Sequence, residues 1–139
     1  MASNVSGMTF RQADLMQSES VPVNICDSLS CLHALEHFGL GRYGDPIDPE
    51  GHIKGLTSLT KLLKPGGTLL LSVPIGFERV EFNGHRVFSV ETILSLTKSD
   101  YDLISFSYID DNDDFHNRTK IVEVPEMTYA CGLFELKKY

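Results

Sequence analysis

The sequence predicts a mixed α/β domain in which a mostly parallel sheet ends in an antiparallel C-terminal edge. Residues 68–73 form a nearly continuous apolar run, which is typical of a strand buried on both faces of a sheet. Helical apolar repeats lie on both sides of this run, so strands and helices alternate along the chain before two closing strands. These observations favour an open sheet that is covered by helices.

Length and charge narrow the range of partners. The chain has 139 residues, enough for one hydrophobic core, so we expect a single domain over residues 1–139. Hydrophobic content of 42% and charged content of 22% are ordinary for a globular protein. The formal net charge of −7 argues against nucleic acid as a partner, because phosphate binding needs a basic face. It also disfavours binding to anionic membranes.

Neither a membrane span nor a secretion signal is expected. No apolar run approaches the roughly 20 residues that a transmembrane helix needs. Residues 1–7 have neither a basic flank nor a hydrophobic segment. The three cysteines, Cys26, Cys31 and Cys131, are odd in number and lack metal-ligand spacing. We interpret them as reduced thiols of a cytoplasmic protein.

The first third of the chain predicts two strands and a long loop. Residues 8–12 alternate apolar and polar side chains, which predicts a short strand directly before Asp14. Residues 25–32 predict a second strand. Residues 39–51 are rich in Gly, Pro and Asp, and loops of this length are more often functional than accidental.

A helix is expected to follow this loop. Asp48 is suited to the N-cap position and Pro49 to the first helical position. Pro65-Gly66-Gly67 is expected to end the helix before the apolar strand begins. The apolar residues at helical spacing are Ile53, Leu56, Leu59, Leu62 and Leu63.

The C-terminal half predicts a hairpin, a short helix and two strands. Residues 77–88 alternate around an Asn83-Gly84 turn, and Ser89 is placed to cap a helix. The acidic run at residues 110–114 is interpreted as a solvated loop tip. The closing strands are predicted at residues 101–109 and 129–137.

The most informative stretch lies at the end of the strand predicted at residues 25–32. His33, Glu36 and His37 are spaced by three and four residues, which places them on one side of a single helical turn. Ligand sites of open α/β sheets lie at the carboxyl ends of strands. Two imidazoles and a carboxylate can bind a divalent metal. Alternatively, Glu36 and His37 orient the turn, pair with Arg42 or Arg86, or contact a substrate.

Several motifs together resemble a known enzyme class. Leu35-Glu36-His37 and the segment from Leu63 to Pro74 resemble the second half of class I S-adenosylmethionine-dependent methyltransferases. Ala13-Asp14-Leu15 resembles the acidic turn that follows the third strand in that class. More closely, residues 33–44 and Asn83-Gly84-His85-Arg86 resemble an uncharacterised methyltransferase-like family, first described from nematode proteins and also found in bacteria.

The resemblance covers most of residues 8–139 and implies a Rossmann-like methyltransferase fold. It implies methyl transfer from S-adenosylmethionine to a hydroxyl of a small molecule or glycan. Arg42 and Tyr43 would then contact a polar substrate such as a sugar, or else anchor the loop. The residues that it implies for the cofactor are Asp14, Cys31, Leu32 and His33.

His85 gains two candidate roles from the resemblance. Some methyltransferases that act on hydroxyls have a Glu-x-x-Glu-His segment and a later histidine, which implies a metal site formed by Glu36, His37 and His85. His33 stands at the first position of that segment, which shifts the preferred metal from magnesium toward zinc, iron or manganese. His37 and His85 are also the candidate catalytic residues, His85 as a general base near neutral pH. The alternative is that His85 is an inert loop residue.

One part of the family pattern is missing. The sequence has no strand–Gly-x-Gly–helix segment, which in the family forms the cofactor-binding turn after the first strand. We therefore expect an N-terminally truncated form of the fold, for which methyl transfer by this chain alone does not follow from the resemblance. The alternative function is a non-catalytic binding or oligomerisation module. An exposed sheet edge would favour a homodimer or a partner chain.

Overall fold

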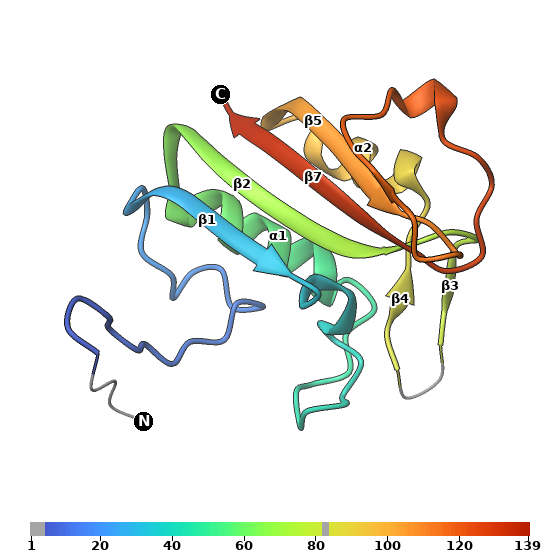
Figure 1. The fold of residues 1–139 in the computed structure, drawn as a ribbon. Helices are drawn as coiled ribbons and strands as arrows, with labels where there is room; N and C mark the ends of the chain where they lie inside the picture. The colour runs from blue at the N-terminus through green and yellow to red at the C-terminus, as the bar shows by residue number, and fades with distance from the viewer. Residues whose placement is uncertain (1–4, 82–83) are drawn as a thin grey trace.

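The computed structural model describes residues 5–81 and 84–139 and contains one five-stranded sheet, a two-stranded ribbon and two α-helices (Figure 1). The strands of the large sheet are β1 (Cys26–Leu32), β2 (Leu63–Ile75), β5 (Tyr101–Ile109), β6 (Phe115–His116) and β7 (Ala130–Lys138). The ribbon pairs β3 (Arg79–Val80) with β4 (Arg86–Val87). The helices are α1 (Gly51–Leu62) and α2 (Val90–Thr97), with 3₁₀ turns at Leu35–His37 and Ile121–Glu123.

The large sheet has the strand order β1-β2-β7-β5-β6. β1 is parallel to β2, and Cys31 lies opposite Leu71 in their register. β7 is antiparallel to both of its neighbours, β2 and β5. The predicted α/β class with an antiparallel C-terminal edge is therefore confirmed, in a sheet of mixed pairing. β1 ends the sheet within the part of the chain that the structure describes.

The two faces of the sheet differ in how they are covered. Figure 1 shows α1 and α2 on the same face, behind the strands. Leu69, Leu71 and Val73 of β2 face the helices and are at most 1% exposed, whereas Leu70 on the opposite face is 43% exposed. The expectation that β2 is buried on both faces is therefore wrong at Leu70, but it holds for Ser72 and the rest of the strand up to Ile75, which are buried on both faces.

Helix α1 begins later than the sequence suggested. Its first residue is Gly51, and the cap position is Glu50, whose side chain makes no capping bond. Asp48 lies two residues before this cap position, and its Oδ1 accepts a hydrogen bond from the Glu50 N–H at 3.0 Å. Its Oδ2 forms an ion pair with Lys54 on the first turn of the helix. Asp48 therefore shapes the approach to the helix instead of capping it.

The end of α1 also differs from the prediction. The helix ends at Leu62, and β2 starts at the next residue, so Pro65-Gly66-Gly67 lies inside β2. Gly66 has a φ of +72°, which glycine adopts without strain. The pairing of β1 with β2 shifts register beside this segment. The Pro-Gly-Gly motif therefore forms an irregularity in the strand and does not stop the helix.

Residues 8–12 do not form a strand, contrary to the prediction. The chain after them packs against α1: Ser58 Oγ donates a hydrogen bond to the Leu15 carbonyl at 2.6 Å, and Lys61 Nζ donates to the Ser18 carbonyl at 3.1 Å. A strand needs a neighbour for its backbone groups. The chain just after residues 8–12 bonds to helix α1 instead.

The remaining predictions agree with the structure. Ser89 caps α2 by accepting a hydrogen bond from the Thr92 N–H at 3.0 Å. The predicted hairpin is the β3–β4 ribbon, although Asn83 at its turn lies outside the described residues. The two closing strands are found within one residue of their predicted limits, and the short strand β6 was not predicted. None of the described helices is long and apolar enough to cross a membrane.

Candidate functional site

Polar side chains gather where β1 ends. The backbone N–H of His33 donates to the carbonyl of Ser72 on β2 at 3.0 Å, so the strand pairing extends to this residue. His33 has a φ of +47°, a conformation that non-glycine residues rarely adopt. The chain then turns away from the sheet into the 3₁₀ turn Leu35–His37. The sequence prediction that His33, Glu36 and His37 lie together at this edge is confirmed.

Glu36 is the buried centre of this group. Its side chain is 2% exposed, and its Oε1 lies 3.4 Å from His33 Nδ1 and 3.7 Å from His37 Nε2. Its Oε2 is buried and has no hydrogen-bond partner among the described residues. Burying a carboxylate is costly unless positive or hydrogen-bonding groups surround it. The two imidazoles are the groups that lie beside this carboxylate.

His37 has a defined tautomer in its neutral form. Its Nδ1 lies 3.0 Å from the carbonyl oxygen of Gly84, which can only accept, so Nδ1 carries the proton. Nε2 is then free of a proton and lies on the side of Glu36. The ring packs edge-on against Tyr43 and His85, with centroid distances of 5.6 and 6.0 Å. His37 can therefore accept a proton, and the carboxylate would stabilise the resulting cation.

The ring of His85 contacts the rings of both His37 and Tyr129. Its ring is 5.4 Å from the ring of Tyr129, and its Nε2 is buried without a hydrogen-bond partner among the described residues. Tyr129 is positioned by its backbone N–H, which donates to Asp111 Oδ1 at 2.8 Å. Two aspartates of the acidic run, which we expected to be a solvated tip, therefore have partners: Asp111 binds backbone at 128–129, and Asp110 binds His116.

Arg42 and Arg86 donate to backbone carbonyls and not to the side chain of Glu36 or to the two histidines beside it. The guanidinium of Arg86 is buried and donates to the carbonyls of Glu36, Phe38 and Pro49. Its burial lowers the pKa of this group. Arg42 donates to the Gly84 carbonyl at 3.2 Å. The alternative in which Arg42 or Arg86 neutralises Glu36 is therefore not the arrangement found.

Asp45 organises the long loop, and the sequence analysis did not single it out. Its carboxylate accepts hydrogen bonds from the backbone N–H groups of Gly39, Gly41 and Tyr43, at 3.0, 3.3 and 3.2 Å. Partial burial raises the pKa of Asp45, but these donors outweigh that effect and the net shift is downward. An aspartate two residues after a glycine–arginine–tyrosine stretch is the local signal that could have indicated this cap.

The loop folds back tightly onto the start of α1. Gly39 has a φ of +74°, and a Cβ atom there would collide with the carbonyl oxygen of Asp48. Only glycine meets both requirements without strain. The close approach brings Tyr43 and Asp45 to the end of β1.

A cavity of about 420 Å³ lies at this edge of the sheet. Its size is within the range of small-molecule sites. Ten residues line it: Ala13, Asp14, Leu15, Met16, His33, Ala34, His37, Phe38, Tyr43 and Asp45. Segments that are far apart in sequence therefore converge, and they include Asp14, His33 and His37 from the predicted set.

Two of the residues predicted for the cofactor are not among those lining the cavity. Cys31 faces the helices and belongs to the hydrophobic core, and burial raises the pKa of its thiol to about 11. Leu32 is 60% exposed on the opposite face. The cause is the alternation of a strand, which sends neighbouring side chains to opposite faces. Cys31 lies near the carboxyl end of β1, but its side chain packs in the core and does not line the cavity.

Asp14 lines the cavity and also fixes its own turn. Its Oδ1 accepts a hydrogen bond from the Met16 N–H at 2.9 Å, and its Oδ2 accepts one from Gln17 Nε2 at 3.0 Å. Each carboxylate oxygen has a second lone pair, so both can accept a further bond from a ligand.

The structure does not show the predicted metal site as a ready set of ligands among the described residues. Among residues 5–81 and 84–139, no group of three or more His, Cys, Asp or Glu side chains is arranged to hold a metal ion. His33 Nδ1 lies 3.4 Å from Glu36 Oε1, while its Nε2 lies 3.1 Å from Cys131 Sγ, so both ring nitrogens already have a neighbouring group. Metal binding by Glu36, His37 and His85 stays a prediction.

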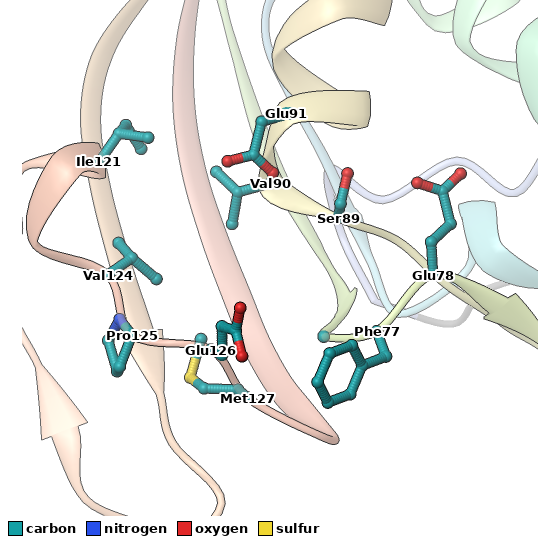
Figure 2. Close-up of a pocket in the computed structure, with 11 residues that line it drawn as sticks. Phe77, Glu78, Ser89, Val90, Glu91, Ile121, Val124, Pro125, Glu126 and Met127 are labelled. Atoms are coloured by element: carbon teal, nitrogen blue, oxygen red, sulfur yellow. The ribbon is translucent and has the colours of Figure 1, made fainter.

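A second cavity, of about 330 Å³, lies beyond the end of β2, between α2 and the segment before β7 (Figure 2). Its walls combine the carboxylates of Glu78, Glu91 and Glu126 with apolar side chains such as Val90 and Met127. None of the residues predicted for catalysis, cofactor or metal lines it. The cavity at the end of β1 is therefore the one that agrees with the sequence.

The first cavity fits part of S-adenosylmethionine. Leu15, Met16 and Phe38 provide apolar surface for a planar base, and Asp14 can accept hydrogen bonds from ribose hydroxyls. The carboxylates of Asp14 and Asp45 would attract a sulfonium cation. Among the described residues, no lysine or arginine lines the cavity to receive the amino-acid carboxylate. The residues present therefore suit the adenosyl and sulfonium parts.

Comparison with known proteins agrees with this fold. The family described as Caenorhabditis protein of unknown function, DUF268, matches residues 5–128. No curated protein matches the sequence significantly.

Solved structures with a similar fold include two methyltransferases and a cyclase, each 14% identical to this chain. The N-methyltransferase NodS from Bradyrhizobium japonicum, in complex with S-adenosyl-L-homocysteine, has a TM-score of 0.58 over 91% of this chain and 52% of its own. The cyclase SpnF has a TM-score of 0.63 over 94% and 56%. The 1,6-didemethyltoxoflavin-N1-methyltransferase of Burkholderia thailandensis, with bound S-adenosylhomocysteine, has 0.55 over 87% and 47%. The chain thus spans about half the length of these proteins.

Proposed function

Because the chain belongs to the DUF268 family and has the fold of S-adenosylmethionine-dependent methyltransferases, we propose that it carries part of a methyltransferase site. The proposed reaction transfers a methyl group from S-adenosylmethionine to a hydroxyl of a small molecule or glycan. The cavity at the carboxyl end of β1 would hold the adenosyl group against Asp14, with His33 and His37 on its other side.

The geometry of His37 is the observation that supports this proposal most. A hydroxyl is a weak nucleophile at neutral pH, so a base must take its proton as the new bond forms. His37 Nδ1 donates to the Gly84 carbonyl, which leaves Nε2 as the proton acceptor. Glu36 lies 3.7 Å from that nitrogen and would stabilise the cation that results. His37 lines the cavity, whereas His85 is not among the lining residues and contacts the ring of His37.

The proposed step balances as a single displacement. Bound S-adenosylmethionine would supply a methyl carbon that carries a good leaving group. The acceptor oxygen would gain the bond to this carbon while the carbon–sulfur bond breaks, its electrons staying on sulfur as S-adenosylhomocysteine leaves. The hydroxyl proton would move to His37 Nε2. Asp14 and Asp45 would hold positive charge near the cavity before the transfer. Tyr43, which packs against His37 and lines the same cavity, would border the acceptor.

The release of S-adenosylhomocysteine tests this function directly. The protein would be incubated with S-adenosylmethionine and a set of sugars and phenols, and S-adenosylhomocysteine would be measured. His37→Gln should reduce the rate by about 100-fold, since general base catalysis contributes roughly that much. A matched control is His52→Gln, because His52 lies on α1 beside Phe88 and outside the cavity. Equal rates for wild type and His37→Gln would contradict the role of His37.

The second candidate function is a non-catalytic binding or oligomerisation module. The exposed edge of β1 favours it: Ile25, just before the strand, and Leu32, its last residue, are 54% and 60% exposed, and within the described residues no strand pairs with its outer side. The cyclase SpnF also indicates that this fold serves chemistry other than methyl transfer.

The oligomeric state distinguishes this candidate. A strand that adds to β1 would form a dimer, which sedimentation velocity would detect as a concentration-dependent species. Replacing Ser30 with proline removes a backbone donor from β1 and should abolish that species. A monomer at all concentrations, together with binding of S-adenosylhomocysteine, would exclude the module.

A further inference from the structure

Cys131 lies within a chain of three interacting groups. It stands near the start of β7, opposite Pro74 of β2, and its Sγ is 3.1 Å from His33 Nε2. The other ring nitrogen of His33 lies 3.4 Å from the Oε1 of Glu36. A thiol, an imidazole and a carboxylate are therefore aligned in the order nucleophile, base and orienting acid. The three residues are distant in sequence and are joined by the fold alone.

The thiol lies on the face of the sheet opposite α1 and α2. In the register with β2 it shares that face with Pro74 and Ser72, which are buried, and with Leu70, which is 43% exposed. Cys131 is half-buried, and the side chain of His33 is 47% exposed. A small reagent can therefore approach the sulfur without passing through the core.

Two further features distinguish this group from a chance contact. The backbone of His33 is held at a φ of +47°, and such conformations cluster at functional sites because the surrounding structure must maintain them. The Glu36 carboxylate is almost fully buried, and its Oε2 has no partner among the described residues. Both costs are incurred at the two residues that would activate the thiol.

We propose that Cys131 is a nucleophilic modification site for small carbon electrophiles, with His33 as its base and Glu36 as the group that orients and stabilises the imidazole. Sγ forms a bond to the electrophilic carbon, the leaving group departs with the electrons of its own bond, and the thiol proton moves to His33 Nε2. With iodoacetamide the new bond is Sγ–C, the broken bond is C–I, and iodide leaves. This reactivity does not rest on methyl transfer.

The three cysteines provide internal standards. Cys26 is half-buried at the start of β1 and has no hydrogen-bonded histidine in the described part of the chain. Cys31 is buried in the core. Burial and the charge of Glu36 raise the pKa of Cys131. Without the base, Cys131 would therefore react more slowly than Cys26, and with the base it would react faster. The two interpretations predict opposite orders.

The experiment follows the alkylation of each cysteine by iodoacetamide at neutral pH, with peptide mass spectrometry at timed intervals. In the wild-type protein, Cys131 should be modified about 10-fold faster than Cys26, and Cys31 should stay protected. His33→Gln should slow Cys131 by about 100-fold and leave Cys26 unchanged. Glu36→Gln should also lower the rate at which Cys131 is alkylated.

Protection of Cys31 reports folding in every variant. A variant that exposes Cys31 has lost the core, and the order of the wild-type rates then decides the question alone. Wild-type Cys131 reacting no faster than Cys26 would overturn the proposal. A folded His33→Gln protein in which Cys131 keeps its rate would also overturn it.

Discussion

Arg86 joins strand β4 to two other backbone segments around the site. Its side chain extends from β4 and donates to the carbonyls of Glu36, Phe38 and Pro49, which belong to the turn after β1 and to the long loop. The residue is 6% exposed. A buried cation is tolerated when carbonyl oxygens surround it, and these oxygens depend on it in return. The position of the turn that carries Glu36 and His37 therefore depends on one guanidinium.

Replacing Arg86 with alanine should lower the free energy of unfolding by about 3 kcal/mol, because several buried carbonyls lose their donor. Urea denaturation monitored by circular dichroism measures this change. Arg42→Ala is the matched control, since Arg42 is exposed and donates to one carbonyl, and it should change the value by about 0.5 kcal/mol or less. Equal effects of the two substitutions would contradict the assigned role of Arg86.

Asp111 links the acidic run to the site. Its carboxylate accepts hydrogen bonds from the backbone N–H groups of Thr128 and Tyr129, and these bonds lower its pKa below the ordinary value. Since the folded state holds the ionised form, the stabilisation is present above the ordinary pKa of an aspartate. It is lost as the pH falls through the lowered value.

Asp111→Asn should therefore reduce thermal stability at neutral pH, and the difference from wild type should shrink as the solution is acidified below about pH 4. Thermal unfolding followed by circular dichroism at a series of pH values provides the measurement. Asp113→Asn is the control, because Asp113 belongs to the same acidic run and is exposed. If the difference between Asp111→Asn and wild type were the same at all pH values, the carboxylate would not be the cause.

Local spacing predicted some site residues and not others. His33, Glu36 and His37 follow one another within a single turn, so their proximity could be deduced from the sequence. Cys131 could not be assigned to this group, because it reaches His33 only through the placement of β7 beside β2. Contacts between residues so far apart depend on topology, which a single sequence does not specify.

Strand β2 connects the sequence pattern to the packing. Its residues alternate between the helix-covered face and the open face, although almost all of them are apolar. Leu71 is 1% exposed, whereas its neighbour Leu70 is 43% exposed. An apolar run alone could not reveal that this second face is exposed at Leu70 and buried again at Ser72 and Pro74.

Leu71→Ala should lower the free energy of unfolding by about 3 kcal/mol, because it leaves a cavity under α1. Leu70→Ala removes the same atoms from the open face and should cost about 0.5 kcal/mol. Urea denaturation of both variants gives the comparison. Similar large losses in both would mean that the open face is covered in solution, by a second copy or by another chain.

The success of the element predictions follows from local chemistry. Ser89 and the apolar residues after it carry the signals of α2 within a few positions, and the helix lies where these signals predict. Residues 8–12 carry a strand pattern, but no strand pairs with them, and they are not a strand in the structure. Pro65-Gly66-Gly67 indicated a break, but not whether the break falls in the helix or in the strand.

At the scale of the whole molecule, three segments form the cavity. They are the turn at residues 13–16, the end of β1 with the 3₁₀ turn after it, and the loop at residues 39–51. The sheet positions the second of these, and α1 anchors the other two. The chain corresponds to about half of the methyltransferases that share its fold. We propose that this half binds the adenosyl group by itself at the carboxyl end of β1.

Titration of ¹⁵N-labelled protein with S-adenosylhomocysteine, followed by two-dimensional NMR, tests this claim most directly. If the adenosyl group binds at the end of β1, we expect saturable chemical-shift changes at residues 13–16, at residues 33–38, and at Tyr43 and Asp45, which line the cavity. Glu91 and Glu126, which line the second cavity, should not respond. Unchanged spectra of the folded protein, or changes confined to the second cavity, would contradict the account.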